Sequence, residues 1–171
     1  MQAIVKNALE PEWEARFEPY SYGFRPGRSC HDAIAQIFNL ARPNTRRKWV
    51  LDADIKGAFD NICHQVIEEA TQSFTAKALI TQWLKAGYME NGSFHATEMG
   101  TPQGGVISPL LANIAFLGME KAIGITDNRP GRNRGKRALV RYVDDVRRRE
   151  TAREEGLQRT NTREMCCKAT T

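Results

Sequence analysis

Three aspartates stand where apolar, strand-like stretches of this sequence end. Asp144 and Asp145 follow the run ALVRYV, and Asp54 lies near the end of KWVLDADI, on its polar face. If the two stretches are neighbouring strands of one sheet, the three carboxylates converge at one rim, where their oxygens suit Mg²⁺. Two such ions about 4 Å apart can stabilise the attacking and leaving oxygens of a phosphoryl transfer. Because adjacent aspartates are also common at surface turns, the interpretation depends on Asp54.

Two loops have the composition to bind a nucleotide or a nucleic acid beside such a centre. In GTPQGGVISP, the adjacent Gly104 and Gly105 let the backbone approach a flat or charged ligand closely, with N–H groups available to it. In SYGFRPGRS, Arg25 and Arg28 stand beside aromatic residues that offer stacking surfaces, while the arginines offer phosphate contacts. Each loop also has an ordinary interpretation, as a turn before a helix and as a turn with solvated arginines.

Composition limits the classes of protein to consider. The chain has 171 residues, of which 41% are hydrophobic and 26% charged, so it is one globular domain or a piece of a larger one. It shows no apolar run of membrane-spanning length and no secretory signal, so we expect a cytoplasmic or organellar protein that is not secreted and does not enter a membrane. The Cys-His dipeptides at Cys30 and Cys63 lack zinc-ligand spacing.

Charge is unevenly distributed along the chain. The net charge is +5, and residues 146–171 contribute +3 of it, with seven Lys or Arg against four Asp or Glu. Basicity alone therefore does not indicate a nucleic-acid partner, and that argument has to come from motifs.

The spacing of hydrophobic residues and the positions of turn and capping residues predict the helices and strands that would position these candidates. Helices are predicted over 3–17, 30–41 and 75–88, within 59–74 behind the capping pair Asp60-Asn61, and after Ser108, which would be an N-cap with Pro109 at N1. Strands are predicted over 48–55 and 138–143. Ser29 and Asp32 form a capping pair, and Asn91-Gly92 between β-prone residues predicts a hairpin. Helices and strands without regular alternation favour an α+β fold.

Four motifs, taken in order, resemble a known family. YSYGFRPGRSCHDAI, LDADIKGAFDNI, GTPQGGVISPLLANI and RYVDD are similar in order and spacing to successive motifs of reverse transcriptases, above all those encoded by bacterial and organellar group II introns. The resemblance covers residues 1–145 of the 171. Retrons and diversity-generating elements carry related enzymes, and YSYGFRPGRS favours the intron group.

The resemblance implies roles for the acidic and aromatic candidates. Asp54 and Asp144 would bind both catalytic Mg²⁺ ions, and Asp145 would complete the acidic cluster. Phe59 would screen the sugar 2′ position and so favour deoxynucleotides. The implied substrates are deoxynucleoside triphosphates, an RNA template, which would be the intron RNA, and a DNA primer.

The resemblance also implies which residues bind nucleotide and template. Gln103, Gly104 and Gly105 would lie over the incoming base pair. Arg25 and Arg28 would touch the template nucleic acid. Nothing in the sequence indicates an oligomeric state.

The family fold is a polymerase right hand, which gives an expected division of this chain. Residues 1–47 would be a partial fingers and template-contact segment, and residues 48–145 the palm, an antiparallel sheet with packed helices. Residues 146–171 would be an aberrant, disordered tail. Family members also have fingers segments before this region and a thumb after it, so we expect an incomplete hand.

The expectation for the tail comes from its composition. In the family an apolar strand follows the Asp-Asp pair, whereas here Val146 is followed by Arg147, Arg148 and Arg149. Large aliphatic residues are almost absent beyond this point, so the segment cannot bury a face. A reading-frame shift near codon 145 would explain the change, and a natural charged extension is the alternative.

A missing return strand would leave the acidic tip loose, and without the remaining fingers and the thumb the triphosphate and the template would lack contacts, so the chain alone is expected to be inactive as a polymerase. Three functions remain open on the sequence. The first is an RNA-directed DNA polymerase, and the second an RNA-binding intron maturase without polymerase activity. The third is an inactive remnant of an intron gene. Substitution of Asp54 separates the first from the second, because only polymerisation needs its carboxylate.

Overall fold

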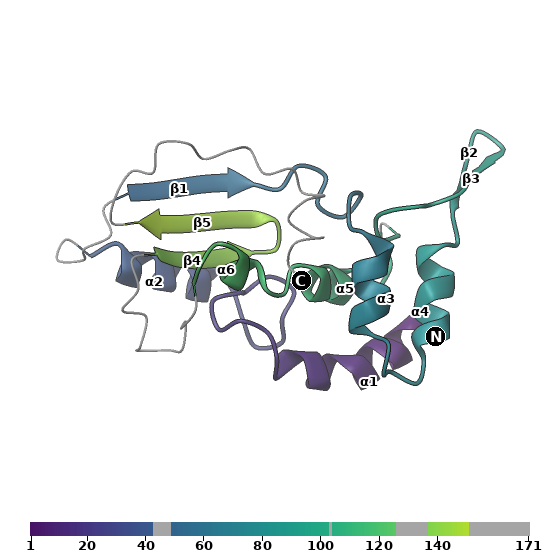
Figure 1. The fold of residues 1–171 in the computed structure, drawn as a ribbon, viewed down its shortest axis with the longest axis horizontal. Coiled ribbons are helices and arrows are strands. Elements are labelled where there is room, and N and C mark those ends of the chain that lie inside the picture. The colour runs from purple at the N-terminus through teal and green to yellow at the C-terminus, as the bar shows by residue number, and fades with distance from the viewer. Residues whose placement is uncertain (43–48, 103, 126–136, 151–171) are drawn as a thin grey trace.

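The computed structural model describes residues 1–42, 49–102, 104–125 and 137–150, and for residues 49, 145 and 147–150 the backbone alone (Figure 1). Within these ranges the elements do not alternate regularly, in agreement with the predicted α+β class. They are α1 (Gln2–Glu14), α2 (Cys30–Leu40), β1 (Trp49–Asp54), α3 (His64–Ala70), α4 (Lys77–Leu84), β2 (Tyr88–Glu90), β3 (Ser93–His95), α5 (Ser108–Ala115), α6 (Met119–Ala122), β4 (Arg137–Tyr142) and β5 (Asp145–Glu150).

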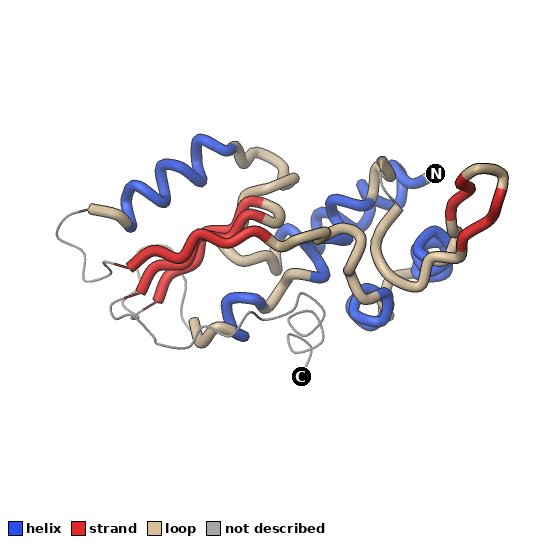
Figure 2. Tube along the Cα trace, turned by 90° about the horizontal axis from the view of Figure 1, so that it is seen from above, coloured by secondary structure: helices blue, strands red, loops and turns tan. Residues whose placement is uncertain are grey.

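A three-stranded antiparallel sheet forms one end of the elongated molecule (Figures 1 and 2). Its order is β1-β5-β4, so the two strands predicted from the sequence belong to one sheet but are separated by β5. A tight turn joins β4 to β5 and pairs Tyr142 with Asp145. In the other ladder, Asp54 lies opposite Asp145. The end of β1 and the start of β5 therefore meet at one rim of the sheet.

The central strand β5 corrects the expectation for the tail. Residues from Arg147 onward were expected to be irregular, yet Asp145–Glu150 is a strand that pairs with β1 on one side and β4 on the other. The composition argument considered side chains only, whereas a central strand is held by main-chain hydrogen bonds on both edges. Val146 adds a side chain to the core, at 9% exposed.

The presence of this return strand counts against the reading-frame hypothesis. It also removes the reason for expecting a loose acidic tip, because Asp145 begins a strand that is paired on both sides. The part of the predicted tail at 151–171 lies outside the described residues.

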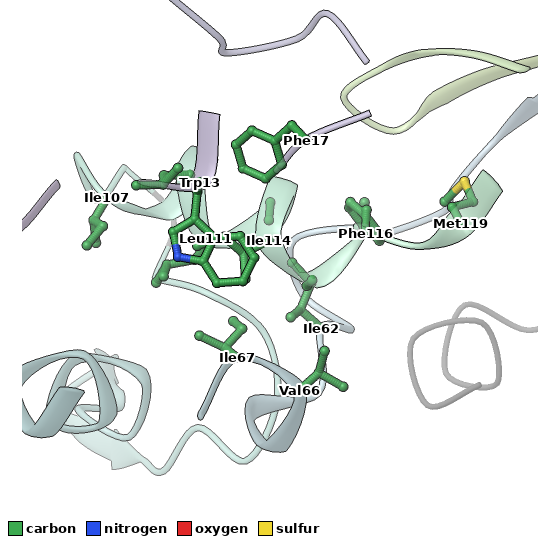
Figure 3. Close-up of a cluster of buried hydrophobic side chains, with 14 of the residues drawn as sticks. Trp13, Phe17, Ile62, Val66, Ile67, Ile107, Leu111, Ile114, Phe116 and Met119 are labelled. Carbon is green, nitrogen blue, oxygen red and sulfur yellow. The ribbon is translucent and has the colours of Figure 1, made fainter. Parts of the chain in front are cut away.

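The main hydrophobic core joins α1, α3, α4 and α5. Val5, Leu9 and Trp13 recur every four residues along α1 and are all buried, as expected for one face of a helix. In Figure 3, Trp13 lies among Leu111, Ile114 and Ile67, which come from α5 and α3. These contacts connect the N-terminal helix to the centre of the chain.

A second, smaller core lies between α2 and the sheet. Ala33 and Leu40 of α2 pack with Ala138 and Val140 of β4, and Figure 2 shows α2 running along one face of the sheet. The backbone around Ser21 also bridges to β4 in the parallel sense. Residues 1–42 therefore pack against the predicted palm region through both α1 and α2.

Local signals are confirmed at two places and displaced at two others. Ser29 and Asp32 form the predicted capping box of α2, and the Asn91-Gly92 turn joins β2 to β3 with φ of 49° and 79°. The helix expected directly behind Asp60-Asn61 begins only at His64, because residues 57–61 form a turn. Ser108, expected to cap α5, is its first helical residue. None of the described helices has the length and hydropathy needed to cross a lipid bilayer.

Candidate active site

The acidic rim of the sheet brings together the three candidate aspartates along the backbone. Asp54 is the last residue of β1, Asp145 is its cross-strand partner, and the Asp144 carbonyl accepts a hydrogen bond from the Ile55 N–H at 3.2 Å. The Asp54 side chain is exposed and that of Asp144 is half-buried. The rim is therefore both acidic and open to a ligand.

The donor set of this rim fits a divalent metal ion of the hard type. Carboxylate oxygens are the ligands that Mg²⁺ prefers, and exposed carboxylates leave its other positions free for substrate oxygens. Among the described side chains, which do not include that of Asp145, no group of three His, Cys, Asp or Glu surrounds a common point. The fit therefore depends on backbone register and on the chemistry of Asp54 and Asp144.

The turn between β4 and β5, residues 142–145, carries Asp144, and this acidic turn has an unusual backbone. Val143 has a φ of 59°, in the left-handed region that β-branched residues rarely adopt. Gly23 lies directly against it, because a Cβ added at Gly23 would come within 2.2 Å of Val143 Cγ2 and 2.6 Å of its backbone nitrogen. The absence of a side chain at residue 23 is therefore what allows this close approach.

Phe59 lies between the acidic rim and the glycine-rich loop. It is half-buried, and its ring meets that of Phe24 edge-on, with centroids 6.2 Å apart. The Phe59 carbonyl accepts a hydrogen bond from the Thr101 N–H at 2.8 Å. Since Phe24 follows the glycine that contacts Val143, a short series of contacts leads from the acidic turn to this aromatic residue. Its predicted role in sugar selection remains a prediction.

The glycine-rich loop is attached to the segment that carries Phe59. The Gly100 N–H donates to the Ile62 carbonyl at 2.7 Å, and the ring nitrogen Nε2 of buried His64 donates to the Gly100 carbonyl at 2.7 Å. Gly100 has a φ of 87°, and a Cβ there would come within 2.8 Å of the Asp60 carbonyl oxygen. Sequence reasoning assigned no role in the site to His64 or to Gly100.

The three nucleotide-binding candidates follow in that loop. Gly104 is exposed with a φ of 79°, and a Cβ there would meet open space, whereas one at Gly105 would lie 2.6 Å from the Ser108 hydroxyl oxygen. Gly104 is therefore the glycine that presents accessible backbone, and Gly105 is the one that packs closely. Gln103 lies outside the described residues.

The guanidinium group of Arg25 is hydrogen-bonded inside the protein. Arg25 is 5% exposed, and its Nε lies 3.0 Å from each carboxylate oxygen of Glu14. Its Nη1 donates to the carbonyls of Glu18 at 2.7 Å and Ser21 at 2.8 Å. A template-contacting arginine must reach solvent, so these internal contacts give no support to the predicted nucleic-acid contact of Arg25, which stays a prediction. The residue instead cross-links the end of α1 to the loop after it.

Arg28 is placed differently. It is half-buried, donates to the Pro19 carbonyl at 2.5 Å, and lies 5.6 Å from the ring centroid of Tyr22. Burial lowers the pKa of Arg28 and raises that of Tyr22. Part of the guanidinium still faces solvent, so Arg28 keeps its predicted contact with nucleic acid as a prediction. The basic loop 129–137 lies outside the described residues except for Arg137.

Sequence reasoning missed the buried residues on the protein side of the acidic turn. They are Gly23, Asn113 and Arg141, all of which are buried. The available signal was Arg141, a charged residue inside the otherwise apolar strand ALVRYV. A charge at that place is costly to bury unless it is hydrogen-bonded, so it pointed to a specific set of partners.

Comparison with known proteins identifies the family to which this arrangement belongs. A family model described as reverse transcriptase (RNA-dependent DNA polymerase) matches residues 1–163. The group II intron-encoded protein LtrA of Lactococcus lactis is 43% identical over 127 residues, which are 72% of this chain and 21% of that protein. Protein YkfC of Escherichia coli is 40% identical over 120 residues, or 67% of this chain and 32% of that protein.

A eukaryotic relative matches the same proportion of the chain. The 91 kDa protein in the cob intron of Schizosaccharomyces pombe is 38% identical over 118 residues, 67% of this chain and 14% of that protein. The chain thus spans between about a seventh and a third of the length of these relatives. With the family match over residues 1–163, the chain belongs to the reverse transcriptase family, and the relatives that it resembles include a group II intron-encoded protein.

Proposed function

We propose that this chain is the palm segment of an RNA-directed DNA polymerase, in which Asp54, Asp144 and Asp145 hold Mg²⁺ ions. The observation on which the proposal depends is the register of the sheet, which sets Asp54 opposite Asp145 and binds Ile55 to the Asp144 carbonyl. Membership of the reverse transcriptase family supports the same role. An RNA template, a DNA primer and deoxynucleoside triphosphates are the proposed substrates.

The chemistry of this rim suits nucleotidyl transfer. When bound there, two divalent ions would lower the pKa of the primer 3′ hydroxyl and stabilise the charge that develops on the leaving pyrophosphate. The carboxylates themselves would bind and orient, because phosphoryl transfer depends almost entirely on positioning and electrostatic stabilisation. The Asp54 side chain is exposed, so a ligand from solvent can reach its carboxylate.

The residues around the rim would form the nucleotide pocket. Phe59, half-buried against Phe24, offers an apolar surface for the sugar of the incoming nucleotide. Gly104 offers backbone without a side chain in the way, and we propose that it lies over the base pair together with Gln103 and Gly105. Arg28 is the proposed contact with the template.

The test compares the wild-type chain with Asp54→Asn, which keeps the side-chain shape and removes the charge. We expect Mn²⁺, used as a probe for Mg²⁺, to bind the wild type at least tenfold more tightly in calorimetric titration. Mg²⁺-dependent primer extension on an RNA template should also be lost in the variant. Asp52→Asn is the matched control, because Asp52 is an exposed acid on the same strand, two residues before the rim.

The results also separate the polymerase from a maturase. Cation binding that is equal in the wild type and Asp54→Asn would refute the proposed site. RNA binding that survives Asp54→Asn, with no primer extension by the wild type, would instead favour the RNA-binding maturase.

A further inference from the structure

A buried arginine lies three residues before Asp144 and contacts the turn that carries it. Arg141 is 2% exposed, and its Nη1 donates to the Asn113 Oδ1 at 3.1 Å and to the Val143 carbonyl at 3.4 Å. The guanidinium carbon lies 5.6 Å from the ring centroid of Phe116. Burial lowers the pKa of Arg141 to about 10, so the group remains protonated at neutral pH. A buried charge of this kind has to be held by fixed hydrogen-bond partners.

The partners of Arg141 are themselves fixed to other parts of the fold. Asn113, on α5, accepts from Arg141 and donates through Nδ2 to the Gly23 carbonyl at 2.8 Å. The Arg141 backbone accepts from the Tyr22 N–H at 2.9 Å and donates to the Tyr20 carbonyl at 3.0 Å. Strand β4, helix α5 and the segment 20–23 are therefore connected through Arg141, next to the acidic turn.

These contacts act on the peptide that precedes Asp144. The Val143 carbonyl belongs to the peptide plane that also contains the Asp144 nitrogen, so a donor that fixes this carbonyl restricts the orientation of Asp144. Val143 itself is in a left-handed conformation that its branched side chain disfavours. Gly23 contacts Val143 from one side and Arg141 binds its carbonyl. The turn is thus held in a strained conformation by its neighbours.

We propose that Arg141 and Asn113 are positioning residues for the cation site: they hold the Val143–Asp144 peptide so that the aspartates after it converge on Asp54. The inference rests on the proposed function of that rim. Neither residue reaches solvent, so neither contacts substrate. Their effect is on geometry, and catalytic carboxylates need to be held within about 0.5 Å.

Two variants test this inference. Arg141→Lys keeps the positive charge but replaces the planar guanidinium, whose Nη1 donates to both Asn113 and Val143, with an ammonium group on a flexible stem. Asn113→Ala removes the anchor while leaving Arg141 in place, so a folding defect in one variant does not decide the outcome. We expect both variants to bind Mn²⁺ at least tenfold more weakly than the wild-type chain. In primer extension, the Mg²⁺ concentration for half-maximal rate should rise by a similar factor, with partial recovery at saturating Mg²⁺.

The control is Thr71→Val, which removes a buried side-chain hydrogen bond to the Ile67 carbonyl, away from the sheet. A purely structural role would lower the melting temperature of all three variants and leave the cation affinity unchanged. Cooperatively folded Arg141→Lys or Asn113→Ala with a Mn²⁺ affinity within twofold of the wild type would overturn the inference. A wild type whose Mn²⁺ binding does not depend on Asp54 would overturn the proposed function, and this inference with it.

Discussion

The close contact between Gly23 and Val143 predicts the effect of adding one methyl group at residue 23. At Gly23, a Cβ would lie 2.2 Å from Val143 Cγ2 and 2.6 Å from the Val143 backbone nitrogen. The backbone of Gly23 itself does not have a positive φ, so Gly23→Ala introduces a steric conflict without an intrinsic conformational penalty. A backbone nitrogen cannot move aside as a flexible side chain can. Either the acidic turn or the segment 20–23 therefore has to shift.

The size of the shift follows from these distances. Ordinary contact begins near 3.4 Å, so the backbone of Val143 must move by about 0.8 Å and its methyl group by about 1.2 Å. Overpacking of this kind typically costs about 1–3 kcal/mol. In a chain of this size each kcal/mol lowers the melting temperature by roughly 2–4 °C. A displacement of about 1 Å at the reacting groups lowers a catalytic rate by about a hundredfold.

The assay measures stability and cation binding on the same preparation. We expect Gly23→Ala to melt cooperatively at a lower temperature and to bind Mn²⁺ more weakly, with primer extension reduced by about a hundredfold. Gly27→Ala is the matched control, since a Cβ there meets no atom within 4 Å although its φ of 66° makes the substitution unfavourable. Equal Mn²⁺ affinity in the two alanine variants would show that residue 23 does not set the position of the acidic turn.

Three further substitutions test other parts of the fold. Glu14→Gln leaves the guanidinium of Arg25 without its anionic partner and should lower the free energy of unfolding by about 1.5–3 kcal/mol in urea titration, and an unchanged urea midpoint would count against this. Asp32→Asn should destabilise the chain fully above about pH 4 and progressively less at lower pH: hydrogen bonds from Ser29 lower the pKa of Asp32, so its contribution is complete above the usual carboxyl pKa and is lost as pH falls through the lowered value, and a difference that does not shrink below this pH would contradict this. Gly100→Ala should lower the melting temperature more than Gly27→Ala, because a Cβ at residue 100 would meet backbone atoms and one at residue 27 would meet none. Equal melting temperatures of the two variants would disprove this.

The features that could be predicted from the sequence are those fixed by local chemistry. The capping box at Ser29 needs only two residues in one turn, and the Asn91-Gly92 hairpin needs only two residues that accept positive φ. The placement of Asp54 and Asp144 at strand ends follows from the point at which each apolar run stops. In each case the determining residues are neighbours in the chain, so the pattern can be read directly.

The features that sequence reasoning did not find depend on partners distant in the sequence or on the main chain. Arg25 stands beside aromatic residues like a ligand-binding arginine, but Glu14, eleven residues earlier, binds it internally. Strand β5 has a composition typical of a solvated tail, and its place in the sheet comes from backbone pairing with β1 and β4. Neither relation leaves a local signal in the sequence.

The solvent exposure of each residue at the acidic rim distinguishes residues that can bind a ligand from residues that can only support the turn. Asp54 is exposed, Asp144 is half-buried and Arg141 is almost completely buried, so the site passes from groups that a ligand can reach to a group that only other protein atoms can reach. Carboxylates that lie close together repel one another, and a turn with a left-handed valine is unfavourable on its own. Both costs have to be offset by contacts next to the turn, which here come from Gly23 and from Arg141 with its partner Asn113. An Asp-Asp pair in a sequence therefore indicates a cation site only when the chain also supplies the residues that hold its turn, and in this protein those residues come from three separate segments.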